Sequence, residues 1–155
     1  MLDVMILLAA SFFGTLGYAF LLRIEYKLVP SASLAGLFSY GLYMLVYHLT
    51  SDLFLSNFSG ALLASVSAYL LAIFYRVPAT VFYTPAIIPL VPGGLLYYTM
   101  FAAISANTAD FLSYGGDALL VGLGLASGII LGTVAVRIAR TCLQLRSRKQ
   151  GDKHP

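Results

Sequence analysis

The sequence predicts an all-α polytopic membrane protein, because its composition and the spacing of its apolar stretches agree on that fold class. Hydrophobic residues make up 60% of the 155 residues and charged residues only 10%, whereas about a quarter of an ordinary soluble domain is charged. The mean hydropathy of +0.90 indicates the same environment. Apolar stretches of about 20 residues, the length that crosses a bilayer, recur along the chain. A chain of this length has room for one domain.

We predict about five transmembrane helices, and we place them at residues 2–22, 32–49, 57–75, 80–104 and 118–138. Residues 1–139 then form a single transmembrane helical domain, and residues 140–155 form a basic cytoplasmic tail. The first helix is interpreted as a retained span, because its only charged residue is Asp3 and a signal peptide begins with basic residues.

Short polar or proline-containing segments separate the predicted helices. Pro30 ends the first loop, and Ser31 or Ser33 is expected to cap the second helix. The sequence Thr-Ser-Asp at residues 50–52 forms the second break, and Arg-Val-Pro at residues 76–78 forms the third. A longer polar segment, residues 105–117, is expected to be the fourth loop.

The charges of the predicted loops alternate along the chain. Basic residues lie in the first loop, the third loop and the tail, at Arg23, Lys27, Arg76 and from Arg137 onward. The second and fourth loops carry only acidic residues, Asp52, Asp110 and Asp117, which are expected to be solvated. Basic loops face the cytoplasm, so the N-terminus is predicted outside and the C-terminus inside. Four spans, with the second helix on the membrane surface, would put Arg23 and the basic tail on opposite sides.

Two predicted helices carry a small residue at every fourth position. These residues are Gly60, Ala64, Ala68 and Ala72 in the third helix, and Gly124, Gly128 and Gly132 in the fifth. Such a stripe lies nearly on one helix face and allows two backbones to approach closely, which drives helix association in lipid. We therefore predict helix-packing faces, either within the chain or in a homo-oligomer.

The residues required for enzyme chemistry are missing from the predicted spans. They contain no mid-span Asp, Glu, Lys or Arg, and the chain has no zinc-protease, nucleophile-elbow or phosphate-loop motif. His48 lies four residues before Asp52, and an interfacial histidine is favoured over a metal site or proton relay. The single cysteine, Cys142, is interpreted as an apolar filler. No enzyme activity, metal, cofactor or nucleic-acid partner is predicted; the basic tail is a topology anchor.

The fourth predicted helix contains an unusual cluster of prolines and glycines. Pro85, Pro89 and Pro92 lack an amide hydrogen and clash with the preceding turn. Gly93 and Gly94 allow backbone angles that other residues avoid. A continuous helix is not expected, and broken helices at membrane depth are how transporters expose backbone groups to solutes. A kinked helix packed against its neighbours is the alternative.

We predict that this segment lines a substrate path. The second half-helix would begin near Gly93 with its positive dipole end facing the break, where backbone amides could contact an anionic group. The hydroxyls of Tyr97 and Tyr98 could hydrogen-bond a polar solute, unless both side chains lie at an interface. The candidate residues are Pro85, Pro89, Pro92, Gly93, Gly94, Tyr97 and Tyr98.

The spacing Pro85-x3-Pro89-x2-Pro92-Gly93, after a helix that ends in Arg76-x-Pro78, resembles the motif of the threonine/serine exporter (ThrE) family. The length, helix count and basic tail are most similar to its short, split form, the YjjB-like small subunit. This resemblance implies efflux of small polar metabolites, either threonine and serine or dicarboxylates such as succinate. It also implies a bacterial inner-membrane location and a second, longer membrane subunit as partner, in addition to the lipid bilayer and the polar solute.

A non-transporting membrane scaffold or assembly partner is the alternative function. The small-residue stripes and the low charge of the spans fit that role equally well. A neighbouring gene for a longer membrane protein of the same family would favour the exporter.

Overall fold

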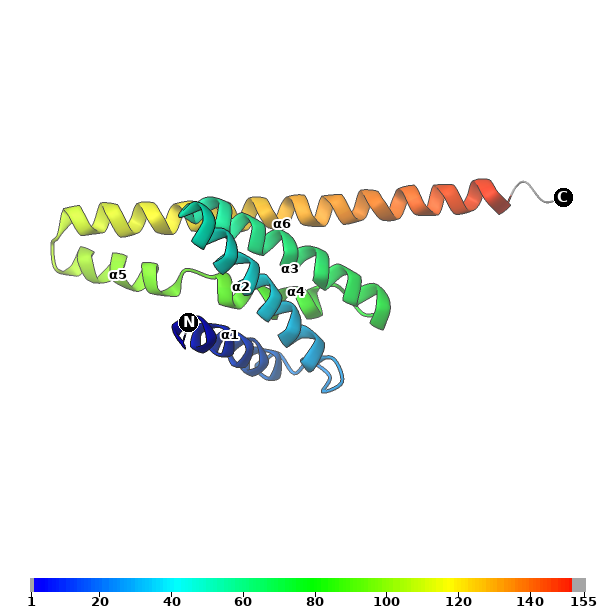
Figure 1. The fold of residues 1–155 in the computed structure, drawn as a ribbon, viewed down its shortest axis with the longest axis horizontal. Coiled ribbons are helices and arrows are strands. Elements are labelled where there is room, and N and C mark those ends of the chain that lie inside the picture. Colours follow the sequence, from blue (N-terminus) through cyan, green and yellow to red (C-terminus); the bar gives the residue numbers. More distant parts are fainter. Residues whose placement is uncertain (1, 152–155) are drawn as a thin grey trace.

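In the computed structural model, the backbone of residues 2–151 and the side chains of residues 5–141 are described, and this part of the chain contains helices but no strand (Figure 1). The helices are α1 (Leu2–Leu21), α2 (Val29–Thr50), α3 (Leu53–Tyr75), α4 (Thr80–Ile87), the 3₁₀ turn η1 (Ile88–Leu90), α5 (Gly93–Ile104) and α6 (Thr108–Gly151). The side chains of Asp3 and Cys142, and those of the tail beyond Cys142, lie outside the described part.

Several of these helices can cross a membrane. Three are long and apolar enough to do so: α2, α3 and residues 108–141 of α6. The segments α4–η1 and α5 together meet the same test as one span that is bent by 51°. The apolar part of α1, Met5–Leu21, is shorter than a typical span of about 20 residues. The chain is a multi-pass helical membrane protein, and the larger span count stays a prediction.

The central helix of the bundle is α3, and one of its faces contacts α6 (Figure 1). A Cβ atom built at Gly128 would lie 2.5 Å from the Phe58 carbonyl oxygen and 2.9 Å from the Ala61 Cβ. One built at Gly124 would lie 2.6 Å from a backbone oxygen of α3, and Gly132 is equally close to Ser65. Successive glycines meet successive turns of α3, so the two helices run parallel and their backbones touch.

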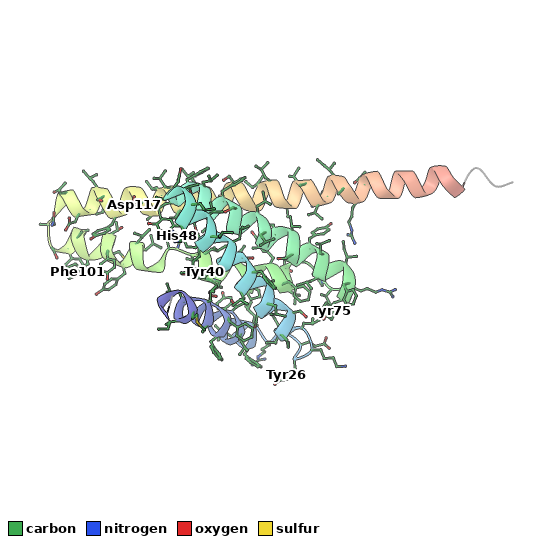
Figure 2. All side chains as sticks on the ribbon, viewed as in Figure 1. Tyr26, Tyr40, His48, Tyr75, Phe101 and Asp117 are labelled. Atoms are coloured by element: carbon green, nitrogen blue, oxygen red, sulfur yellow. The ribbon has the colours of Figure 1, made fainter. Side chains whose placement is uncertain are left out.

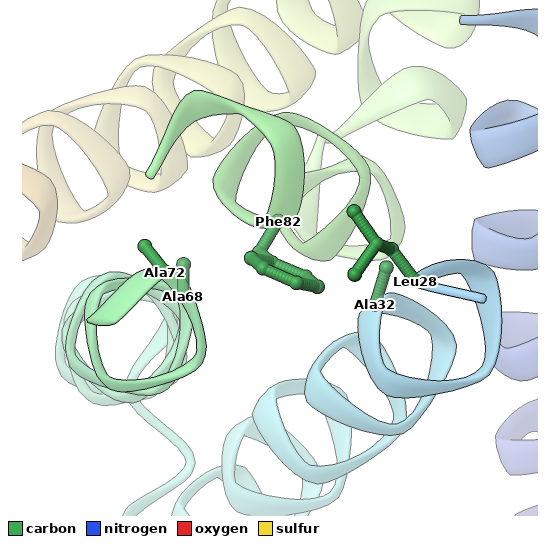
Figure 3. Packing of buried hydrophobic residues seen from close by; sticks show 5 residues of the cluster. All are labelled: Leu28, Ala32, Ala68, Ala72 and Phe82. Carbon is green, nitrogen blue, oxygen red and sulfur yellow. The ribbon is translucent and has the colours of Figure 1, made fainter. Parts of the chain in front are cut away.

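A second face of α3 contacts α2 and α4. The buried residues Gly60, Ala64, Ala68 and Ala72 lie on it. Figure 3 shows the Phe82 ring of α4 between the two alanines nearest the end of α3 and the side chains of Leu28 and Ala32. Because alanine leaves room for the ring, three helices meet at this point. The small residues of α3 therefore organise both of its neighbouring layers.

The start of α2 differs from the prediction. The helix begins at Val29, and Pro30 lies in its first turn rather than in the loop, because a missing amide hydrogen costs nothing there. Neither serine caps the helix: Leu28 occupies the N-cap position without a side-chain hydrogen bond, and the Ser33 hydroxyl donates to the Val29 carbonyl at 3.0 Å. The predicted serine cap is wrong.

The fourth predicted loop is also wrong for most of its length, because α6 begins at Thr108. Asn107 and Asp110 form a reciprocal cap. The Asn107 amide nitrogen donates to the Asp110 carboxylate at 2.7 Å, and the Asp110 backbone amide donates to the Asn107 side-chain oxygen at 3.3 Å. The second bond satisfies one backbone amide that a helix start leaves free, and the first, between the two side chains, holds the cap in place. At its other end α6 continues past residue 138 to Gly151, through residues that mostly favour helix.

The basic loops lie at one end of the bundle. Ile24 of the first loop packs in the same cluster as Val77 of the third, and the Arg140 guanidinium lies 5.1 Å from the centre of the Tyr69 ring, near the end of α3. Figure 2 shows Tyr26 and Tyr75 toward this end and His48 and Asp117 toward the other. The loop charges that alternate along the sequence are thus separated in space.

Candidate functional site

A cavity of about 260 Å³ opens at the break between η1 and α5. It is lined by Tyr40 and Tyr43 of α2, Leu53 and Asn57 of α3, residues 89–95 of the break, and Val121 of α6. The smallest pockets that hold drug-sized ligands have a volume of about 300 Å³, and this cavity is slightly smaller. The cavity can therefore hold a small metabolite.

A larger cavity, of about 480 Å³, lies along α1 and α2. Its lining is mostly apolar, and its titratable side chains are Tyr47 and His48. Asp52, four residues after His48, caps α3 by accepting hydrogen bonds from two backbone amides. No group of three or more metal-ligating side chains occurs among the described residues. We therefore build the site on the smaller cavity, where polar groups meet a helix break.

The prolines shape the backbone at the break. Pro85 lies inside α4, Pro89 lies in η1, and Pro92 takes the N-cap position of α5. Each removes the amide that would bond a carbonyl four residues earlier. The chain becomes extended at Val91, with ψ 129°, and the Val91 amide bonds the Ile88 carbonyl at 3.2 Å in a tighter turn. The span therefore bends and restarts.

The restart leaves free amides at the N-terminus of α5. The Gly93 amide donates to the Val91 carbonyl at 2.8 Å, and the Leu96 amide donates to the Pro92 carbonyl at 3.0 Å. The amides of Gly94 and Leu95 donate to no group in the described part of the chain. Free amides and the positive end of the helix dipole make a helix start able to hold an anionic group.

Asn57 brings an unpaired polar atom to the same cavity. The residue is only 2% exposed, and its Nδ2 donates to the Leu53 carbonyl at 2.9 Å. Its Oδ1 accepts no hydrogen bond from a described residue. In the described part of the chain, every side-chain oxygen or nitrogen that is fully enclosed has a hydrogen-bond partner, so Oδ1 is not fully enclosed. Oδ1 must therefore reach open space, and the cavity is the space that Asn57 lines.

The other buried polar side chains differ from Asn57. The hydroxyls of Ser33, Ser39 and Ser65 donate to carbonyls four residues earlier in their own helices. Such bonds use the hydroxyl hydrogen locally, and none of the three serines lines the cavity. The predicted spans carry no mid-span charge, yet Asn57 brings a polar side chain with an unpaired oxygen to the interior of the bundle.

Two tyrosines form the α2 side of the cavity. The rings of Tyr40 and Tyr43 stack with their centres 5.5 Å apart. A Cβ at Gly60 would lie 3.2 Å from the Tyr43 Cβ and 3.0 Å from a Leu90 methyl group, so this glycine allows α2 and η1 to approach α3. No Asp, Glu, Lys, Arg or His lines the cavity in the described structure. It is therefore polar but uncharged.

The predicted path residues divide into two groups. Pro89, Pro92, Gly93 and Gly94 line the cavity, whereas Pro85 is buried in α4. Tyr97 and Tyr98 project from α5, 63% and 52% exposed, and Tyr98 lies beside Tyr114 of α6 with 5.6 Å between ring centres. Pro85, Tyr97 and Tyr98 therefore do not contribute to the cavity wall.

The role expected of the two glycines needs a correction. Neither Gly93 nor Gly94 has a positive φ, so the unusual backbone angles are not used. No atom of the described structure lies within 4 Å of a Cβ built at either position. What glycine provides here is open space beside the helix start.

Asn57, Tyr40, Tyr43 and Val121 were not identified from the sequence. One signal was available: Asn57 is the one Asn or Gln within the predicted spans. Polar side chains are costly within a membrane, so this residue could have been singled out as a candidate.

One known family matches most of the chain. A family model described as "Threonine/Serine exporter, ThrE" matches residues 7–135, which include the whole break and every residue of the cavity wall. The chain belongs to this family. The resemblance based on the proline motif is thereby confirmed. The threonine/serine exporters are transporters rather than enzymes, in agreement with the chemistry of the spans. No curated protein and no solved structure matches the chain.

Proposed function

We propose that this chain is a subunit of an exporter of small polar metabolites and that the cavity at the α4–α5 break holds the solute. The solutes proposed are threonine and serine, or a dicarboxylate such as succinate. The observation that carries the proposal is the position of the buried residue Asn57, whose unpaired Oδ1 reaches the cavity that the free amides of α5 also line. Broken helices supply such amides to solutes in other transporters.

The proposal includes a second, longer membrane subunit. The open space beside Gly93 and Gly94 supports it, because the chain itself leaves that side of the cavity without a wall. The apolar side chains of α5 support it as well, since Tyr97, Phe101 and Ile104 are all more than half exposed. A partner that covers α5 would close the solute path against lipid.

We place the protein in the bacterial inner membrane with the N-terminus outside and the C-terminus inside. The gathering of Arg76 and Arg140 at one end of α3 supports this orientation, because basic residues favour the cytoplasmic face. The solute would then enter from the end at which the basic loops lie.

Cysteine accessibility tests the path directly. Gly93→Cys is introduced into a Cys142→Ser background, in membranes of cells that make the protein. We expect a water-soluble thiol reagent to modify position 93 and L-serine, L-threonine or succinate to slow the modification. Ile130→Cys is the control, because Ile130 is 59% exposed on α6 outside the cavity and should contact lipid. An unreactive position 93 would refute the solute path.

Transport measurements test the exporter role and the partner separately. Cells without the gene should accumulate the exported solute, and Gly93→Leu should reproduce that loss at normal membrane abundance, because the added side chain meets open space. Normal export by Gly93→Leu would favour a kinked helix and the scaffold role. Robust transport by the purified chain alone in liposomes would refute the need for a second subunit.

A further inference from the structure

We propose that Asn57 selects the solute by its charge pattern. Its Oδ1 accepts a hydrogen bond from the ammonium group of a zwitterionic amino acid, while the amides of Gly94 and Leu95 bind the carboxylate. This inference rests on the proposed function and adds the residue that discriminates between amino acids and dicarboxylates.

The hydrogen-bonding capacity of Asn57 is the first step of the argument. A carboxamide oxygen has two lone pairs, and the nitrogen has two hydrogens. The bond from Nδ2 to the Leu53 carbonyl fixes which end is the nitrogen, because a carbonyl can only accept. Oδ1 therefore keeps its full capacity as an acceptor, and the cavity receives an atom that suits an N–H donor.

The side chain is held in this orientation. A Cβ built at Gly124 would lie 3.2 Å from the Asn57 Cβ, so the α6 backbone passes directly beside the residue. Val121 of α6 and Leu53 of α3 line the same wall. With α6 on one side and its own helix carbonyl on the other, Asn57 presents Oδ1 without reorganisation when a solute arrives.

The charge of the cavity is the second step. The described wall contains no Lys, Arg or His, so the free amides of α5 are its strongest group for holding a carboxylate. They suit one carboxylate, at the positive end of the helix dipole. A second carboxylate would face Oδ1 without a counter-charge, and a buried unpaired charge is costly.

An ammonium group meets a favourable surface at the same place. Oδ1 can accept from it, and a bond to a charged donor is roughly twice as strong as one between neutral groups. Tyr40 and Tyr43 line the same cavity, and aromatic rings attract cations. The arrangement fits a molecule with one carboxylate and one ammonium group.

A pair of matched solutes tests the proposal in the unmodified site. L-serine and 3-hydroxypropionate differ only in the ammonium group, and succinate carries a second carboxylate. With the Gly93→Cys reporter in cell membranes, L-serine should protect against the thiol reagent at concentrations on the order of ten- to a hundredfold lower than 3-hydroxypropionate or succinate. Equal protection by L-serine and 3-hydroxypropionate would overturn the role of Asn57. Protection by none of the three would instead refute the solute path.

Variants of Asn57 then locate the selectivity. Asn57→Leu keeps the volume but removes the acceptor, so the preference for L-serine over 3-hydroxypropionate should disappear. Asn57→Asp keeps an oxygen acceptor and should retain the preference, and the membrane abundance of both variants is measured to control for folding. Ser65→Ala is the matched control, because Ser65 is buried in the same helix but does not line the cavity. A preference that survives in Asn57→Leu, or is lost in both variants, would overturn the proposal.

Discussion

The contact between α3 and α6 can be tested at Gly128, where the clearance is known. A Cβ atom there would lie 2.5 Å from the Phe58 carbonyl oxygen, 2.9 Å from the Ala61 Cβ and 3.1 Å from the Leu62 amide nitrogen. Ordinary contact begins near 3.4 Å, so the helices must separate by about 1 Å, a gap that forfeits a quarter to a half of the local dispersion energy. Two of the three atoms are backbone and cannot move away by changing rotamer.

We therefore expect Gly128→Ala to destabilise the protein by about 1–3 kcal/mol and Gly128→Leu to lower its membrane abundance. Unfolding in detergent measures the change in free energy. Gly122→Ala is the matched control on the same helix, because no atom lies within 4 Å of its Cβ position, and it should be neutral or stabilising by up to about 1 kcal/mol. Equal stability of the two alanine variants would refute the packing argument. Ile130→Leu should also leave abundance unchanged.

Three further predictions concern the caps, the topology and the α1–α2 contact. Asp52→Ala removes the acceptor of two amides in the first turn of α3 and should lower the unfolding free energy by about 1 kcal/mol, while Asp52→Asn should retain most of it. A reporter that is active only outside the cytoplasm should stay inactive when fused after Lys153, and strong activity would contradict the N-out, C-in topology. Gly36→Ala should loosen α1 from α2, because its Cβ would clash with the buried Thr15, whereas Gly41→Ala has a nearest neighbour at 3.8 Å and should be tolerated.

The helix boundaries that follow from local chemistry could be predicted from the sequence. The end of α3 before Arg76 agrees with the prediction, because a following proline acts within a few residues. The break after α2 was predicted as well, but α3 begins at Leu53 rather than at residue 57, because Asp52 caps its first turn. The start of α6 was missed although its signal is also local. Polar residues before Asp117 were interpreted as a loop, yet Asn107 and Asp110 have the spacing of a reciprocal cap.

The candidate site could be predicted only in part, for a physical reason. Proline acts on its own helix, so the break near Pro92 follows from the sequence alone. The cavity also needs α2, α3 and α6 at defined distances, and tertiary packing sets those distances. Nothing in the sequence around Asn57 says that its Oδ1 stays unpaired, because that depends on which neighbours surround it. The position of Tyr40 in the cavity wall could not be predicted for the same reason.

Helix packing and solute selection are coupled at Gly124, the first of the three α6 glycines that contact α3. A methyl group at Gly124 would press on the Asn57 Cβ at 3.2 Å, whereas one at Gly132 would meet Ser65, which lies outside the cavity. Both positions approach α3 to 2.6 Å, so Gly124→Ala and Gly132→Ala should destabilise the protein to a similar extent, by about 1–3 kcal/mol. Only Gly124→Ala should also weaken the preference for L-serine over 3-hydroxypropionate, because it displaces Oδ1. If both variants lost stability equally and kept the same preference, the position of Asn57 would not be what selects the solute.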